Sequence, residues 1–169
     1  MDLTKKTDEQ LERLIENHVE KKATGLPIYR ELLEERARRS QNTHKLNFDR
    51  SLGALKDAAR RGVCITYGDL AAASSVEWSQ ARHQMNGSAG HLDRLLDLCH
   101  ARGLPLLTAI CVNQAGVRTG ELGEDALAGF VAGARRLGLF VTDGKAFHHA
   151  CRDACWEWGR KQSEEDAQS

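Results

Sequence analysis

The 169-residue chain has few aromatic residues, only two prolines and no net charge. Lys and Arg together number 24, as do Asp and Glu, which excludes a strongly basic protein that coats nucleic acid. No apolar run approaches the roughly 18 residues that a membrane span needs. The first residues, MDLTKKTDEQLERL, also lack the apolar stretch of a signal peptide. We therefore expect a cytoplasmic protein without membrane association.

The five cysteines are an odd number and include no CxxC pair, which excludes a disulfide framework and a zinc knuckle. His148, Cys151 and Cys155 share one face of a predicted helix, and Cys99 and His100 add two more residues of metal-ligand type. Phe147 and Trp158 lie on the same stripe as the two helical cysteines, however. Core packing is therefore favoured over a metal, and no cofactor is expected.

Charge is distributed unevenly along the chain. Residues 1–62 hold 14 basic and 11 acidic side chains, whereas the remainder has a small acidic excess. The basic residues gather in KK at 21, RARR at 36 and RR at 60. Any electrostatic contact with a nucleic acid should thus be local. The charged helices predicted within residues 7–39 are an alternative surface for a protein partner.

Hydrophobic spacing and helix-end signals predict a helix-rich α+β protein. Residues 1–62 form a helical N-terminal segment, residues 63–160 a winged-helix-like core with two C-terminal helices, and residues 161–169 a flexible tail. The apolar run LPLLTAICVN at 104–113 is the one convincing strand. Helices are expected at residues 7–22, 27–39, 48–61, 91–101, 123–138 and 144–159.

The stretch ITYGDLAAASSVEWSQARHQM, residues 65–85, contains two successive helix starts. Thr66 with Asp69 caps the first helix, and Ser74 with Glu77 matches the capping box of a second. A strand and the turn NQAGVRTGEL follow, which completes the order of a winged helix-turn-helix. Packing between the two helices is assigned to Tyr67, Leu70, Ala71, Val76, Ala81 and Met85.

The outer face of the second helix then carries the candidate DNA contacts. Hydroxyl, amide, guanidinium and imidazole groups hydrogen-bond base edges and phosphates. Arg118, at the tip of the predicted wing, is placed to reach a phosphate. The candidate nucleic-acid-binding residues are Ser79, Gln80, Arg82, His83, Asn86 and Arg118.

ITYGDLAAA and the helix after it resemble the entry of the DNA-binding domain in alkyltransferases and alkyltransferase-like proteins. The likeness covers about residues 64–120 and implies a winged helix that docks in the minor groove of DNA. Alkyltransferases carry their methyl acceptor in a Pro-Cys-His-Arg strand, where this chain has LLTAICVN. Cys111 lies near that place without the following His and Arg, so methyl transfer is not implied.

Nearly the whole chain also resembles a family of small, uncharacterised bacterial proteins, mainly proteobacterial. The likeness is carried by LIENHVEKKATGLPIYRELLEERARR, DRSLGALKDAARRG, ITYGDLAAASSVEW, LLTAICVN and LAGFVAGARRLG. This resemblance implies a bacterial protein and conveys no activity.

From these patterns we predict a non-catalytic DNA-binding protein in a bacterial or phage regulatory or defence setting. The alternative is a protein-interaction module, an inhibitor or adaptor of another bacterial complex, with no nucleic-acid binding. Asp143 and Lys145 lie at a turn without a second acidic strand residue, so a nuclease is not favoured. Trp156 and Trp158 are two residues apart, so we expect one to be buried and the other to lie nearer the surface. If that second tryptophan belongs to an exposed apolar patch, a homodimer is favoured.

Overall fold

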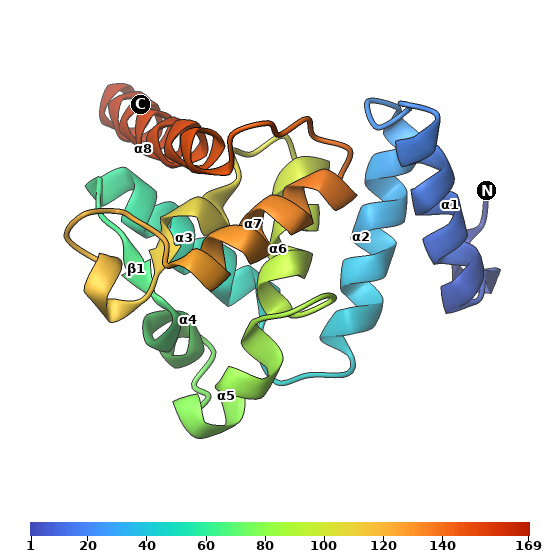
Figure 1. The fold of residues 1–169 in the computed structure, drawn as a ribbon, viewed down its shortest axis with the longest axis horizontal. Helices are drawn as coiled ribbons and strands as arrows, with labels where there is room; N and C mark the ends of the chain where they lie inside the picture. Colours follow the sequence, from blue (N-terminus) through green and yellow to red (C-terminus); the bar gives the residue numbers. More distant parts are fainter.

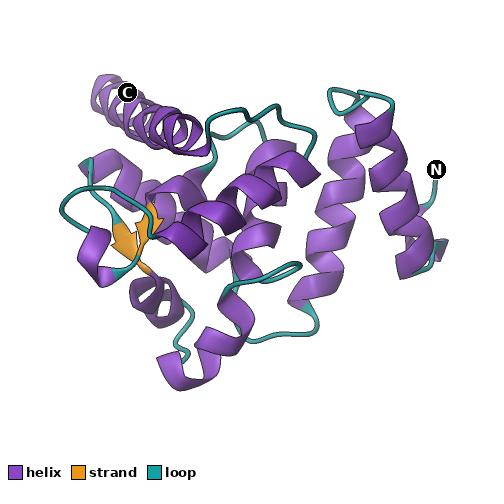
Figure 2. Cartoon of the chain, viewed as in Figure 1, coloured by secondary structure: helices purple, strands orange, loops and turns teal.

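A computed structural model describes residues 1–169 and confirms a helix-rich α+β protein (Figures 1 and 2). The strands form a single two-residue pair, β1 (Ile65–Thr66) with β2 (Cys111–Val112), and every other element is helical. None of the helices combines the length and apolar composition that crossing a bilayer requires. The helices are α1 (Asp8–Glu20), α2 (Pro27–Gln41), α3 (Phe48–Arg61), α4 (Tyr67–Ala73), α5 (Trp78–Met85), α6 (His91–Ala101), α7 (Glu124–Arg136) and α8 (Gly144–Gln168), with short 3-10 helices η1 (Leu3–Lys5), η2 (Leu107–Ile110) and η3 (Gln114–Gly116).

Local signals in the sequence set several helix ends. The side chain of Thr7 accepts a hydrogen bond from the Gln10 backbone and caps α1. Gly62 takes a left-handed conformation, with φ of 66°, and ends α3 as a glycine at this position commonly does. Thr66 and Asp69 form a reciprocal capping box at the start of α4, as predicted.

One hydrophobic cluster of 29 buried residues extends from Leu11 in α1 to Cys155 in α8. Its main contacts are between α3 and α8 and between α2 and α6. A Cβ added at Gly159 of α8 would lie only 2.1 Å from the carbonyl oxygen of Ala59, so α3 and α8 approach backbone to backbone there. Buried residues before and after residue 62 therefore belong to one hydrophobic core.

The predicted strand at 104–113 is wrong over most of its length. Residues 107–110 form the buried η2, and only Cys111 and Val112 are extended. These two residues pair in parallel with Ile65 and Thr66, so β2 forms its backbone hydrogen bonds with β1, a segment far away in the sequence. No antiparallel hairpin follows, because Asn113 caps the 3-10 turn η3. The wing expected around Arg118 is not formed.

The break between α4 and α5 also differs from the prediction. Ser74 ends α4, Ser75 has a positive φ of 57°, and the Val76 amide donates to the carbonyl of Ala71. This arrangement is a Schellman-type helix end, which takes precedence over a capping box starting at Ser74. The Ser74 hydroxyl instead accepts a hydrogen bond from the Asn47 backbone, and α5 begins after Glu77 without a side-chain cap.

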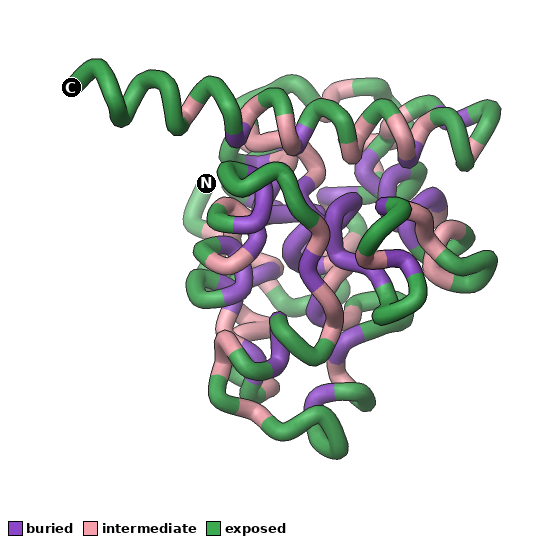
Figure 3. Tube along the Cα trace, turned by 90° about the vertical axis from the view of Figure 1, so that its left-hand side faces the viewer, coloured by how far each residue is buried: buried purple, intermediate pink, exposed green.

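The C-terminal helix is longer than predicted. α8 continues to Gln168 through residues 161–168, which were expected to be a flexible tail. Figure 3 shows this end of α8 exposed and extending past the body of the protein. Trp156 and Trp158 are both half-buried against the core, and Trp156 donates to the carbonyl of Val63. Neither forms the exposed patch on which the homodimer expectation depended.

Candidate functional site

The helix pair α4–α5 forms as the sequence predicted. Leu70 and Ala71 of α4 and Ala81 and Met85 of α5 are all buried. Tyr67 and Val76 are partly buried against the same core. This packing fixes which face of α5 turns inward and leaves the opposite face to solvent.

The outward face of α5 carries the side chains expected to contact DNA. Ser79, Gln80, Arg82 and His83 are all exposed, and Asn86 is exposed where the helix ends. Arg82 has no ion-pair partner within the chain. Its guanidinium is therefore available to a ligand.

Two further residues belong to this surface and were missed from the sequence. The Lys45 ammonium donates to the Gln80 side chain at 3.2 Å, although 35 residues separate them. Trp78 is 42 % exposed, and its ring stacks on Tyr67 with centroids 6.5 Å apart. Trp78 lies three and seven residues before Ala81 and Met85, a spacing typical of the buried face of a helix, so only the tertiary structure shows that Trp78 is exposed. We call Trp78, Ser79, Gln80, Arg82, His83, Asn86 and Lys45 the α5 surface.

Arg118 is not brought to the α5 surface. It is exposed and follows η3. In Figure 1 this segment lies beside β1, and α4 lies between it and α5. Without the predicted hairpin, nothing extends Arg118 toward the face that the other five candidates share.

The surface proposed for a protein partner, residues 7–39, is partly occupied by contacts within the chain. Arg36 binds Asp97 at 2.9 Å and Glu12 at 2.8 Å. Arg39 binds Asp8 at 2.7 Å. Fewer charges on α1 and α2 are therefore free for a partner than the sequence alone suggests.

The residues considered for a metal do not converge as the sequence pattern would require. Cys155 is fully buried and its thiol donates to the Leu106 carbonyl, while Cys151 is half-buried. Burial raises the pKa of Cys99 to about 12 and that of Cys151 to about 11. Both thiols therefore stay protonated near neutral pH, which disfavours their use as nucleophiles. Cys155 belongs to the main hydrophobic cluster, which confirms its predicted core packing.

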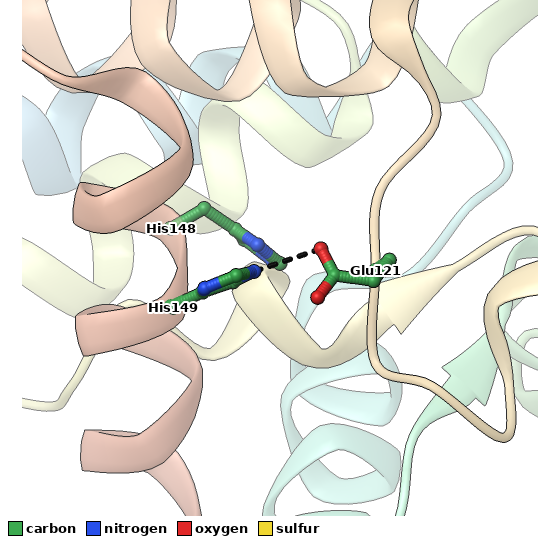
Figure 4. A group of neighbouring side chains, drawn as sticks. All are labelled: Glu121, His148 and His149. Carbon is green, nitrogen blue, oxygen red and sulfur yellow. Dashed lines mark hydrogen bonds and ion pairs between the residues drawn. The ribbon is translucent and has the colours of Figure 1, made fainter.

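A different group, Glu121, His148 and His149, brings its ligand-type atoms within 4.8 Å of one another (Figure 4). His148 bonds the Ala109 carbonyl through Nε2 at 2.8 Å, and His149 bonds Glu121 through Nε2 at 2.8 Å. Arg152 lies 3.5 Å from the other oxygen of Glu121 and supplies a positive charge beside it. Hydrogen bonds and an ion pair within the chain account for this group.

Asp143, which sequence reasoning weighed as part of a nuclease site, caps a helix. Its carboxylate accepts a hydrogen bond from the Ala146 backbone at 3.1 Å and so begins α8. Asp and Asn are favoured at this position because they satisfy an amide that has no partner inside the helix. The capping role explains the residue.

A cavity of about 700 Å³ lies between α6 and α7. Asn86, Gly87 and Ser88, which follow α5, form part of its rim. This cavity could not be predicted from the sequence, because its walls come from segments far apart in the chain. Asn86 therefore belongs to both the α5 surface and the rim of this cavity, which is open to solvent.

No family model, curated protein or solved structure matches this chain. The function is therefore inferred from the residues and their geometry.

Proposed function

We propose that the protein binds duplex DNA, without catalysis, through the α5 surface. The observation that carries this proposal is the shared exposed face of Ser79, Gln80, Arg82 and His83. All four project from one short helix whose other face is anchored in the core. A rigid helix with free polar side chains is what groove recognition requires.

The size of α5 fits this role. An α-helix is about 10–12 Å across with its side chains and fits the major groove, which is about 12 Å wide, and the eight residues of α5 give a helix about 12 Å long. Arg82 is suited to a guanine edge or a phosphate, and Ser79 and Gln80 are suited to hydrogen bonds with either. The proposed binding mode is thus a helix-turn-helix without a wing, in which Arg118 does not contact the stretch of DNA that α5 binds.

The charge of the α5 surface sets the strength of binding that we expect. Arg82 and Lys45 are its two full positive charges, and the chain as a whole is neutral. Two phosphate contacts release few counterions, so affinity should be moderate and should fall gently with salt. Such binding suits the bacterial or phage regulatory or defence setting that we predict from the sequence.

The test is Arg82→Ala, measured by fluorescence anisotropy with a labelled duplex. We expect affinity to fall roughly tenfold, within the usual range for loss of one such contact. The thermal midpoint should stay unchanged, because Arg82 makes no ion pair within the chain. Arg13→Ala is the matched control, since Arg13 is exposed on α1 and also lacks an ion-pair partner.

Equal affinity of wild type and Arg82→Ala would exclude α5 as the contact. An equal loss in Arg82→Ala and Arg13→Ala would show non-specific charge attraction. If neither variant nor wild type binds duplex DNA, a protein partner becomes the explanation to test.

A further inference from the structure

The cavity between α6 and α7 has the size and lining of a small-molecule site. Its volume of about 700 Å³ falls within the roughly 300–1,000 Å³ typical of ligand pockets. Leu92 and Leu96 of α6 form one apolar wall, and Leu122 and Phe130 form another. Such walls accept an apolar ring or chain.

One residue in the wall of this cavity carries a polar group without a partner. Thr108 is 6 % exposed, and its hydroxyl is the only buried side-chain oxygen or nitrogen in the protein without a hydrogen bond. A buried polar group left without a partner is costly, and so few occur in folded proteins. Thr108 is one of the residues that line the cavity, and its buried hydroxyl lies behind the cavity wall, where rotation of the side chain would present it to a bound molecule.

The charged residues of the cavity wall favour a cation over an anion. Asp93 and Arg136 pair with each other and largely cancel. Glu124 and Asp125 have no ion-pair partner, which leaves two unbalanced negative charges. They occupy the first turn of α7 and complement its dipole, so this helix end offers little to an anion.

We infer that this cavity binds a small organic amine whose apolar body packs on the leucine and phenylalanine walls. Its ammonium group lies toward Glu124 and Asp125, and a polar atom of the ligand satisfies the Thr108 hydroxyl. This site meets the α5 surface only at Asn86 on its rim, and binding of the amine does not depend on the proposed DNA contact. Its test therefore uses no DNA, and either proposal can fail alone.

The experiment compares three probes of one shape by protein-observed NMR. Phenethylamine is the cation, 2-phenylethanol its neutral counterpart and phenylacetate the anion. We expect phenethylamine to bind with a dissociation constant on the order of 1 mM, as is usual for so small a molecule. Phenylacetate should bind at least about tenfold more weakly, because unpaired carboxylates repel it. Binding by none of the three, or tighter binding of phenylacetate, would overturn the proposal.

A blocking variant locates the site. Gly129 lines the cavity, and a Cβ added there meets no atom within 4 Å, so Gly129→Leu introduces a side chain at the cavity wall without a clash at Cβ. Gly53→Leu is the matched control, because Gly53 is an exposed helical glycine of α3 with equally open space. Binding should be lost in Gly129→Leu and retained in Gly53→Leu. Retention in both variants would place the ligand elsewhere and refute the site.

Thr108→Val then tests the hydroxyl itself. Valine keeps the shape of threonine and removes the buried oxygen, so the protein should be at least as stable as wild type. Affinity for 2-phenylethanol, whose hydroxyl is its one polar group, should fall several-fold. Unchanged affinity in this variant would show that the Thr108 hydroxyl does not contact the ligand.

Discussion

Two helices that follow one another in the chain, α5 and α6, use their polar side chains in opposite ways. α6 buries eight of its eleven residues, including Arg94 and Asp97, whereas α5 buries only Ala81 and Met85. The buried charges of α6 are satisfied within the chain. The exposed groups of α5 are mostly free. Polar residues of α6 therefore maintain the fold, and those of α5 remain available for binding.

The clearest case on α6 is Asp97. Its carboxylate accepts two hydrogen bonds from Arg36 at 2.9 Å and one from Arg94 at 3.0 Å. All three side chains are largely buried. Arg82 on α5 has no comparable partner, so removing it should leave nothing unpaired. This contrast yields predictions that separate stability from binding.

The largest effect is expected from Asp97→Ala. This change leaves the buried guanidinium of Arg94 without a counter-charge and leaves Arg36 with Glu12 alone. Loss of one partner from a buried pair typically costs 3–5 kcal/mol, and we expect a decrease of about 3 kcal/mol or more in the free energy of unfolding. Urea denaturation followed by circular dichroism measures it. Arg82→Ala is the control and should leave the free energy of unfolding unchanged. A decrease below about 1 kcal/mol in Asp97→Ala would contradict the claim that the polar residues of α6 maintain the fold.

A second effect concerns His91 at the start of α6. Its ring bonds the Ser51 hydroxyl at 2.7 Å, and burial, with a smaller effect of His44, lowers its pKa to about 3. The unfolded chain has a histidine pKa near 6.5, so below that pH the unfolded state takes up a proton that the folded state excludes. Stability should fall as pH decreases from about 6.5 toward 3, by about 2 kcal/mol between pH 7 and pH 5.

Urea unfolding at pH 7 and pH 5 measures this dependence, with His91→Asn as the comparison variant. The variant lacks the titrating ring, so its stability should change less between the two pH values. Equal changes in wild type and His91→Asn would show that His91 does not control the response to acid.

The smallest effect is expected at the break between α4 and α5. Ser75 has a left-handed backbone conformation that costs a residue with a side chain about 1 kcal/mol more than glycine. Ser75→Gly should therefore raise the thermal midpoint by about 2–4 °C. It should leave DNA affinity unchanged, because it lies outside the α5 surface. A lowered midpoint would contradict the assignment of strain to this residue.

The helices could be predicted because their signals lie within a few residues of each end. Thr7, Gly62 and the pair Thr66–Asp69 each act on their own turn of helix. The strand pair could not be predicted, because Ile65 and Cys111 are far apart in sequence and join in parallel. Ser74 was misassigned because two local signals competed and the end of α4 prevailed.

The candidate site was predictable only in part, for the same reason. Helical spacing identified the exposed side of α5, since it depends on neighbours in sequence. Lys45, Trp78 and the separate position of Arg118 depend on tertiary structure. The cavity around Thr108 draws on several distant segments, and no local pattern marks it.

The most direct test of DNA binding is anisotropy of a labelled duplex titrated with protein at several salt concentrations between about 50 and 200 mM. Arg82 and Lys45 supply about two phosphate contacts, which predicts a slope of about −2 in a plot of log affinity against log salt. Lys45→Ala should reduce this slope by about one. A salt-dependent slope near −2 would support the α5 surface as the contact. No binding at micromolar protein, even at the lowest salt, would contradict it.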